Sequence, residues 1–236
     1  MIDIVSTSFY IKSPVFDKDA FERRSSELFD EWESQVEIYL NLPDYALSLV
    51  LEEGSLKGRG KIAAAVTALY IGIGEYGDFV SGLRTMQEQA SYLSTALFQE
   101  AKDRFSCSSE RGNSKQTGGD LIYLRKLFER VQAGAVTPDQ AVAEVQARWG
   151  EEANGSPEFM RALASNLKAA PHHPEQLTLS DESWPDCLFP EALEGEPKPQ
   201  PRAPRAPEVP IPQHYRIEIS RPSRNENKKI KLSKVR

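Results

Sequence analysis

The last forty residues differ in charge and composition from the rest of the chain. Residues 197–236 contain eleven Lys and Arg against three Asp and Glu, although the whole chain has a formal net charge of -6. The preceding residues therefore form an acidic body, with 18 basic against 32 acidic residues. Eight of the sixteen prolines also fall in this last segment. Because such a composition leaves little apolar surface to bury, we expect a largely disordered tail that contacts a partner and adds little to stability.

Length and composition bound the fold of the body. The chain has 236 residues, of which 39% are hydrophobic and 27% charged, enough for one sizeable core and a small second unit. We expect an α+β protein with four parts. These are a body over residues 1–105, a flexible linker over 106–119, a helical hairpin plus one further helix over 120–170, and a proline-rich basic tail over 171–236.

The cysteine and histidine pattern predicts neither a metal centre nor a disulfide framework. The two cysteines, Cys107 and Cys187, have no zinc-ligand spacing, and His172 and His173 are adjacent, so their side chains should diverge. The first residues lack the basic start and continuous apolar run of a secretory signal. We therefore expect a cytoplasmic protein that holds no metal and no cofactor.

The first half of the chain alternates between strand and helix patterns. Residues 2–11 are rich in β-branched and aromatic residues, residues 17–42 place apolar side chains at helical spacing, and residues 45–51 alternate again. This order predicts a small β-α-β unit. Residues 62–73 are almost entirely apolar, which predicts a buried central helix beneath a second long helix. The alternative for 62–73 is membrane insertion, but the run is shorter than the roughly twenty residues that cross a bilayer.

Residues 120–149 have the pattern of a short helical hairpin. Leu124-Arg-Lys-Leu-Phe-Glu-Arg-Val-Gln-Ala-Gly-Ala-Val-Thr-Pro-Asp-Gln-Ala141 contains a leucine-bearing helix, a glycine turn, and a threonine cap followed by proline. This run resembles the helical hairpins of bacterial SHOCT-type modules over some thirty residues. The resemblance implies a role in oligomerisation or docking.

Three cations follow the second predicted strand. The run Gly54-Ser-Leu-Lys-Gly-Arg-Gly-Lys61 precedes the predicted apolar helix, which is the context of a phosphate-binding loop, so Lys57, Arg59 and Lys61 are candidate anion-binding residues. Five residues separate the outer glycines where the Walker pattern has four, and Ile62 replaces the magnesium-binding Ser or Thr. We expect no nucleotide binding. Two alternatives are left for these three cations: weak binding of an anion, or a basic turn that contacts only solvent.

The tail contains the candidate partner-binding residues. An aromatic island near residue 184 suits a pocket on this protein or on a partner. Residues 214–220 alternate like a strand, which must add to a sheet edge of this chain or of another. Basic residues near the C-terminus suit nucleic-acid phosphate, an acidic protein surface or solvent. The candidates are Trp184, Leu188, Phe189, Tyr215, Arg216, Ile217, Ile219, Lys228, Lys229 and Lys231.

No local catalytic signature is present, so we predict no catalytic residues and a non-enzymatic function. The leading hypothesis is an accessory or adaptor subunit of a bacterial multi-protein complex, such as an anti-phage defence system. Its tail and hairpin would bind a larger protein such as an ATPase or nuclease subunit. The first alternative is a nucleic-acid-associated accessory protein whose basic tail clamps phosphate. The second is a membrane-acting effector that uses residues 62–73.

Overall fold

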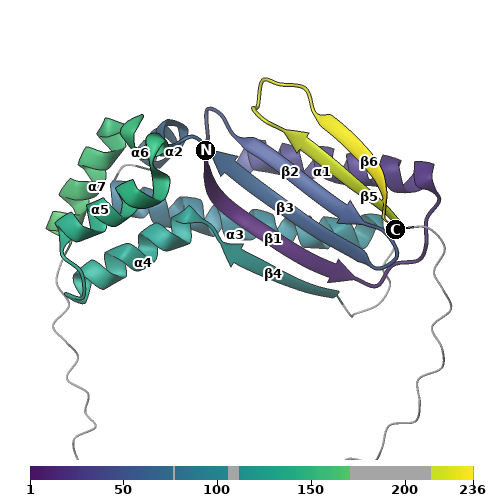
Figure 1. Ribbon diagram of the computed structural model, residues 1–236, viewed down its shortest axis with the longest axis horizontal. Helices are drawn as coiled ribbons and strands as arrows, with labels where there is room; N and C mark the ends of the chain where they lie inside the picture. The colour runs from purple at the N-terminus through teal and green to yellow at the C-terminus, as the bar shows by residue number, and fades with distance from the viewer. Residues whose placement is uncertain (77, 106–111, 171–213, 236) are drawn as a thin grey trace, which may run out of the picture.

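A computed structural model describes residues 1–76, 78–105, 112–170 and 214–235. These residues form an α+β fold built on an antiparallel sheet of six strands, ordered β4-β1-β3-β2-β5-β6 (Figure 1). The strands are β1 (Ile2–Ile11), β2 (Ala46–Glu52), β3 (Leu56–Ala64), β4 (Gly112–Gly118), β5 (His214–Arg221) and β6 (Lys229–Val235).

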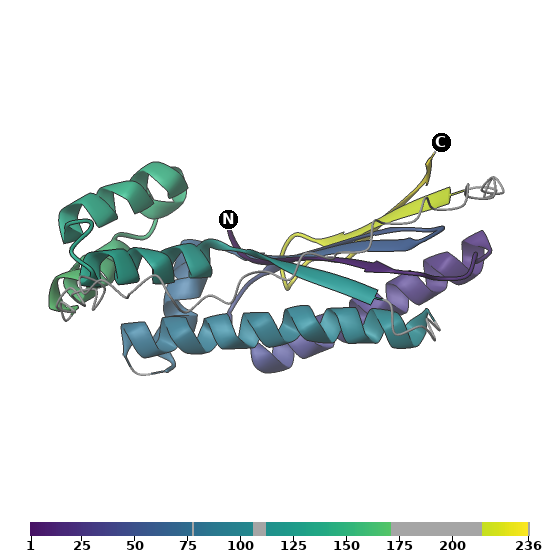
Figure 2. The same ribbon diagram turned by 90° about the horizontal axis from the view of Figure 1, so that it is seen from below.

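Two long helices, α1 (Lys18–Tyr39) and α3 (Phe79–Arg104), lie side by side against one face of this sheet (Figure 2). The other helices gather at one end of the sheet as a helical lobe. They are α2 (Val66–Gly74), α4 (Asp120–Gln132), α5 (Pro138–Trp149), α6 (Glu151–Asn154) and α7 (Pro157–Ala169). In the described part of the chain, no helix covers the opposite face of the sheet, which we call the open face.

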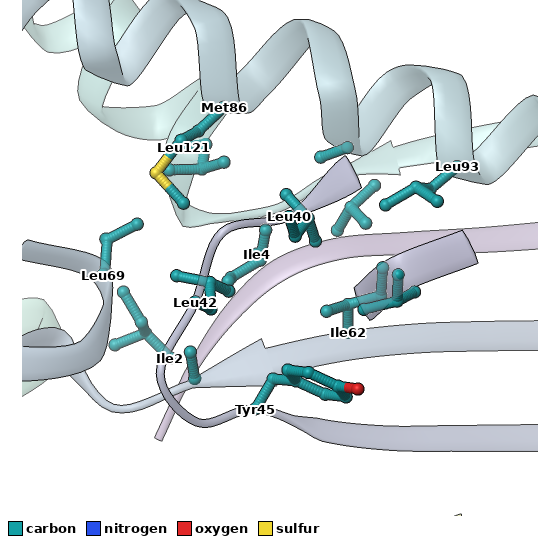
Figure 3. Close-up of a cluster of buried hydrophobic side chains, with 14 of the residues drawn as sticks. Ile2, Ile4, Leu40, Leu42, Tyr45, Ile62, Leu69, Met86, Leu93 and Leu121 are labelled. Atoms are coloured by element: carbon teal, nitrogen blue, oxygen red, sulfur yellow. The ribbon is translucent and has the colours of Figure 1, made fainter. Parts of the chain in front are cut away.

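The main core lies between the sheet and the two long helices. Strand alternation directs Leu49 and Ile62 toward the helices. They belong to the same buried cluster as Trp32 of α1 and Leu97 of α3, and each of the four is at most 1% exposed. At the lobe end of the sheet the core continues through Ile2, Ile4, Leu69, Met86 and Leu121 (Figure 3). A register shift in β1 between Asp3 and Val5 lets two successive residues, Ile4 and Val5, both be buried.

The predicted helix over residues 62–73 is wrong for its first part. Residues 56–64 are strand β3, and the helix α2 begins only at Val66. The alternation of β3 was hard to recognise because its inward positions include Gly58 and Gly60 rather than large apolar residues. The predicted β-α-β order is present as β1-α1-β2, and β3 then follows β2 in a hairpin and lies between β1 and β2 in the sheet. Within the described residues, no helix has both the length and the apolar character of a membrane span.

The predicted flexible linker over residues 106–119 is corrected in its second half. Residues 112–118 form β4, an edge strand that pairs along β1 from Val5 to Ile11. Its sequence, Gly-Asn-Ser-Lys-Gln-Thr-Gly, contains poor strand formers, so the pairing with β1 rather than local propensity sets its conformation. Residues 106–111 lie outside the described part.

The predicted tail over residues 171–236 is also corrected at its C-terminal end. The strand expected at 214–220 is present as β5, and it adds to the sheet of this same chain between β2 and β6. The basic segment beyond it forms β6. Buried Glu53 fixes the start of β5, because its carboxylate accepts hydrogen bonds from the backbone N–H of Tyr215 at 3.3 Å and of Phe16 at 2.9 Å.

The helical lobe has its own capping and is joined to the sheet. Thr137 caps α5 in a capping box with Gln140, as its sequence predicts. The carboxylate of Asp120, at the start of α4, accepts hydrogen bonds from the Asp3 backbone N–H at 2.9 Å and from Arg148 at 2.7 Å. These bonds connect α4, α5 and β1 at one buried point.

Candidate functional site

The open face of the sheet carries a concentration of positive charge. In β3, the outward positions are Lys57, Arg59 and Lys61, because the intervening positions are buried toward the helices. Strand register places cations from three other strands on the same face. The complete set comprises Lys57, Arg59, Lys61, Lys115, Arg216, Lys229 and Lys231, against three carboxylates, Asp3, Glu52 and Glu218.

Two glycines allow β3 to lie close to its neighbours while presenting these cations. A Cβ atom at Gly58 would lie 2.0 Å from Cζ of Phe9, and one at Gly60 would lie 2.3 Å from a methyl group of Leu97. Phe9 is the cross-strand partner of Gly58, so its ring covers the glycine on the helix side of the sheet. The same alternation leaves the side chains of Lys57 and Arg59 in solvent.

Some of the cations on the open face have carboxylate partners. Lys61 lies 2.6 Å from Asp3, and Arg216 lies 2.9 Å from Glu218 and 3.5 Å from Glu52. Lys57, Arg59, Lys115 and Lys231 make no ion pair with any described residue. These four side chains are exposed and available to an anionic ligand.

A hollow of about 410 Å³ lies within this basic surface. Its lining includes Tyr10, Val50, Glu52, Lys57, Arg59 and Arg216, which come from β1, β2, β3 and β5. Tyr10 is 44% exposed, and its hydroxyl group lies 3.1 Å from Oγ of Ser55 in the β2–β3 turn. The hollow thus combines an aromatic ring, an apolar side chain, three cationic side chains and one carboxylate, that of Glu52, which pairs with Arg216.

One of the two helices in the opposite layer of the molecule has the reverse charge. Helix α1 carries seven acidic against three basic residues. The acidic character of the chain as a whole therefore does not extend to the open face, because the sheet separates its outward cations from the acidic α1, while α3 has three acidic and three basic residues. This separation makes the open face attractive to anions despite the net charge of -6.

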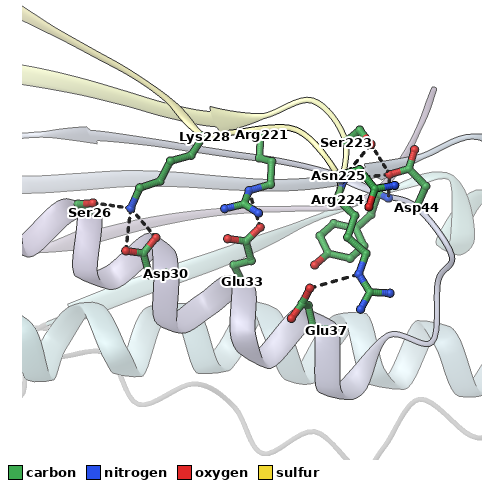
Figure 4. A network of polar contacts seen from close by, with 11 residues as sticks. Ser26, Asp30, Glu33, Glu37, Asp44, Arg221, Ser223, Arg224, Asn225 and Lys228 are labelled. Carbon is green, nitrogen blue, oxygen red and sulfur yellow. Dashed lines mark hydrogen bonds and ion pairs between the residues drawn. The ribbon is translucent and has the colours of Figure 1, made fainter.

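A row of ion pairs joins the β5–β6 hairpin to α1 (Figure 4). Lys228 contacts Asp30 at 2.6 Å, Arg221 contacts Glu33 at 2.8 Å, and Arg224 contacts Glu37 at 3.2 Å. The three carboxylates recur at steps of three and four along α1, so they share one helix face. Burial raises the pKa of Glu33, and the Arg221 guanidinium opposes that shift.

The structure divides the predicted partner-binding residues into three groups. Ile217 and Ile219 are buried in the protein's own core at 0% and 1% exposure, and Lys228 pairs with α1, so these three do not lie on a free surface. Arg216, Lys229 and Lys231 lie on the open face, while Tyr215 is half-buried against the core. Trp184, Leu188 and Phe189 lie outside the described residues.

The predicted anion-binding residues are on the open face as well, but not in a loop. Because residues 56–64 are a strand, the run from Gly54 to Lys61 does not open a helix, and the interpretation as a phosphate-binding loop is wrong. Cations at every second position were the signal for the strand. Lys115 was missed because a polar, glycine-rich segment was interpreted as a linker.

Another hollow, of about 680 Å³, lies where the lobe meets α3. Val80 and Leu83 of α3, Phe128 of α4 and Ala169 of α7 form apolar parts of its wall, and Arg84, Glu88, Arg125 and Glu129 are among its charged residues. Among the described residues, no group of three or more His, Cys, Asp or Glu side chains could hold a metal ion.

Comparison of the chain with models of protein families, with curated proteins and with solved structures finds no match.

Proposed function

We propose that this protein is a non-enzymatic, nucleic-acid-associated accessory protein that binds phosphate groups with the open face of its sheet. The observation that carries the proposal is the gathering of seven cations against three carboxylates on one face of an otherwise acidic chain. Clustered Lys and Arg side chains neutralise phosphates and release counterions, which gives affinity without sequence preference. The phosphate clamp is thus a folded surface rather than a disordered tail.

A direct experiment compares two matched double variants by fluorescence polarisation with labelled DNA at about 50 mM salt. Lys57→Glu/Arg59→Glu reverses two charges on the open face. Lys18→Glu/Lys126→Glu makes the same charge change at exposed residues of α1 and α4. We expect the first variant to lose binding, the second to retain it, and the affinity of the parent protein to fall steeply with salt. Absence of binding by the parent protein, or equal losses in both variants, would exclude the proposal.

A second candidate function is the adaptor role, and the observation favouring it is the 680 Å³ hollow between α3, α4 and α7. We propose that a larger protein partner, such as an ATPase or nuclease subunit, would dock here through an apolar side chain. Val80 is 45% exposed at this hollow, so Val80→Glu should abolish co-purification with the products of adjacent genes while leaving the fold intact. Lys57→Glu/Arg59→Glu should leave that co-purification unchanged.

Membership of a bacterial defence system and oligomerisation through residues 120–149 stay predictions. Oligomerisation would appear in sedimentation as a mass above that of one 26.5 kDa chain. The membrane-acting alternative assumed a single helix over residues 62–73, whereas this segment is divided between strand β3 and helix α2.

A further inference from the structure

We infer that the ligand of the open face is a single-stranded nucleic acid with at least one base stacked at Tyr10. This inference rests on the proposed phosphate-binding function of the same face and adds the form of the ligand. It is carried by three observations: the width of the basic surface, the hollow beside Tyr10, and the small side chains between the cations.

The basic surface is too wide to enter a groove of a DNA duplex and contact its bases. Its cations lie on strands from one sheet edge, β4, to the other, β6. Five inter-strand spacings of about 4.8 Å make this surface about 24 Å across. The major groove of B-DNA is about 12 Å wide and admits a helix or a two-stranded ribbon. The sheet could therefore touch only the outer phosphates of a duplex, whereas a single strand can lie across it with its bases against the surface.

The hollow beside Tyr10 suits an unstacked base. Unpaired bases stack on exposed aromatic rings and on the planes of arginine guanidinium groups. Tyr10, Arg59 and Arg216 all line this hollow, Val50 adds an apolar contact, and Glu52 lines it as the ion-pair partner of Arg216. The Tyr10 hydroxyl donates a hydrogen bond to Oγ of Ser55, so the ring is joined to the β2–β3 turn. In a duplex the same base faces would be stacked on their neighbours and unavailable to these side chains.

Small polar side chains leave room for the strand between the cations. The register places Ser6, Lys61, Ser48 and Ser220 in one row across four strands. The neighbouring row contains the cations Lys115, Arg59 and Lys231 together with Ser8, Val50 and one carboxylate, Glu218. The first row presents short side chains with hydroxyl groups close to the sheet surface. The second row presents cations on three different strands. This arrangement can contact phosphates and base edges of one extended strand at the same time.

The inference is tested with four labelled probes of equal length: single-stranded DNA, single-stranded RNA, the matching DNA duplex and inorganic polyphosphate. Binding is measured by polarisation over a series of salt concentrations, with the full chain. We expect at least one single-stranded nucleic acid to bind at least tenfold more tightly than the duplex and the polyphosphate.

Two substitutions at one position separate stacking from charge. Tyr10→Ala should weaken single-strand binding by about tenfold without changing the salt slope, because it removes a base-stacking surface and no charge. Tyr10→Phe should retain most of the affinity, since the ring remains. Thermal unfolding of both variants checks that they are folded.

The possible outcomes distinguish this inference from the function on which it rests. Equal affinity for duplex, polyphosphate and single strands, or unchanged single-strand binding in folded Tyr10→Ala, would overturn the inference while leaving a phosphate-binding face. No binding of any probe at about 50 mM salt would remove both. Preferential single-strand binding that depends on the Tyr10 ring would support both.

Discussion

Lys228 donates hydrogen bonds from Nζ to both carboxylate oxygens of Asp30, at 2.6 and 2.7 Å, although 198 positions separate the two residues in the chain. The same ammonium group also contacts the Ser26 hydroxyl at 2.8 Å. These contacts hold the β5–β6 hairpin against α1, so the C-terminal residues belong to the fold. This finding replaces the expectation that the last forty residues add little to stability.

Ile219→Ala should lower the free energy of unfolding by about 2–5 kcal/mol, because it leaves a cavity in the core. Ile219 is 1% exposed and is paired with Leu49 of β2. Urea unfolding measures the loss, and Lys231→Ala, at an exposed position of β6, serves as the control with a change within about 0.5 kcal/mol. A negligible effect of Ile219→Ala would show that β5 is not part of the folded sheet.

Gly58→Ala should destabilise the protein by about 1–3 kcal/mol, because the added methyl group would overlap the Phe9 ring on the helix side of the sheet. The control is Gly74→Ala, because a Cβ atom there would have nothing within 4 Å and alanine favours a helix. The control should be neutral or slightly stabilising. Thermal unfolding compares the two, and equal midpoints would contradict the close packing of β3 on Phe9.

Glu33→Gln should become more stable relative to the unmodified protein as the pH rises from 4 to 7. Burial raises the pKa of Glu33 in the folded state, so the folded protein favours the protonated carboxyl. The stability that this protonated carboxyl gives to the folded state is lost as the pH rises through the raised pKa. Glutamine resembles the protonated form and does not titrate. Urea unfolding at both pH values measures the difference.

Glu22→Gln on the same helix corrects for the change in net charge. Glu22 is half-buried, and it has no ion pair with a described residue. A pH dependence of the opposite sign in Glu33→Gln would mean that the Arg221 ion pair outweighs the burial of the carboxylate.

Asp78→Ala should cost about 1 kcal/mol at neutral pH, because Asp78 caps α3 by accepting from the backbone N–H groups of Val80 and Ser81 at 3.0 and 3.2 Å. The hydrogen bond from the Ser81 hydroxyl group, followed by the one from the Val80 N–H, lowers the pKa of Asp78. The stability that the ionised Asp78 carboxylate gives to the cap is therefore fully present above the ordinary Asp pKa. It is lost as the pH falls through the lowered pKa of Asp78 in the folded protein.

Thr137→Ala provides a matched control at a neutral cap, that of α5. Its cost should change little between pH 7 and pH 3, whereas the cost of Asp78→Ala should diminish. Chemical unfolding at the two pH values tests this difference. Parallel behaviour of the two variants would mean that the ionised Asp78 carboxylate does not stabilise the cap.

The sequence alone determined the elements whose periodicity is strong and local. The strand pattern of residues 2–11 predicts β1, the helical spacing after residue 17 predicts α1, and Thr137 with Pro138 predicts the start of α5. Each depends on side chains only a few residues apart, which a linear pattern records. The α+β class follows from these elements.

Only the tertiary structure decided where the remaining strands lie. Gly58 and Gly60 hid the alternation of β3, since their small size is explained by Phe9 and Leu97 across the core. Strand β4 has little propensity of its own and forms by pairing with β1. Strand β5 was recognised as a strand, but its partner, β2, lies more than 160 residues earlier.

The candidate site shows the same division. The sequence identified cations on β3 and near the C-terminus as two separate features, one of them assigned to a loop and the other to a tail. Sheet register brings Arg59 and Lys231 onto one face, with β2 and β5 between their strands. Pairing between distant strands is set by backbone hydrogen bonds and by burial of one sheet face, and neither is encoded by neighbouring residues. A single surface made from both features therefore emerged only in the folded chain.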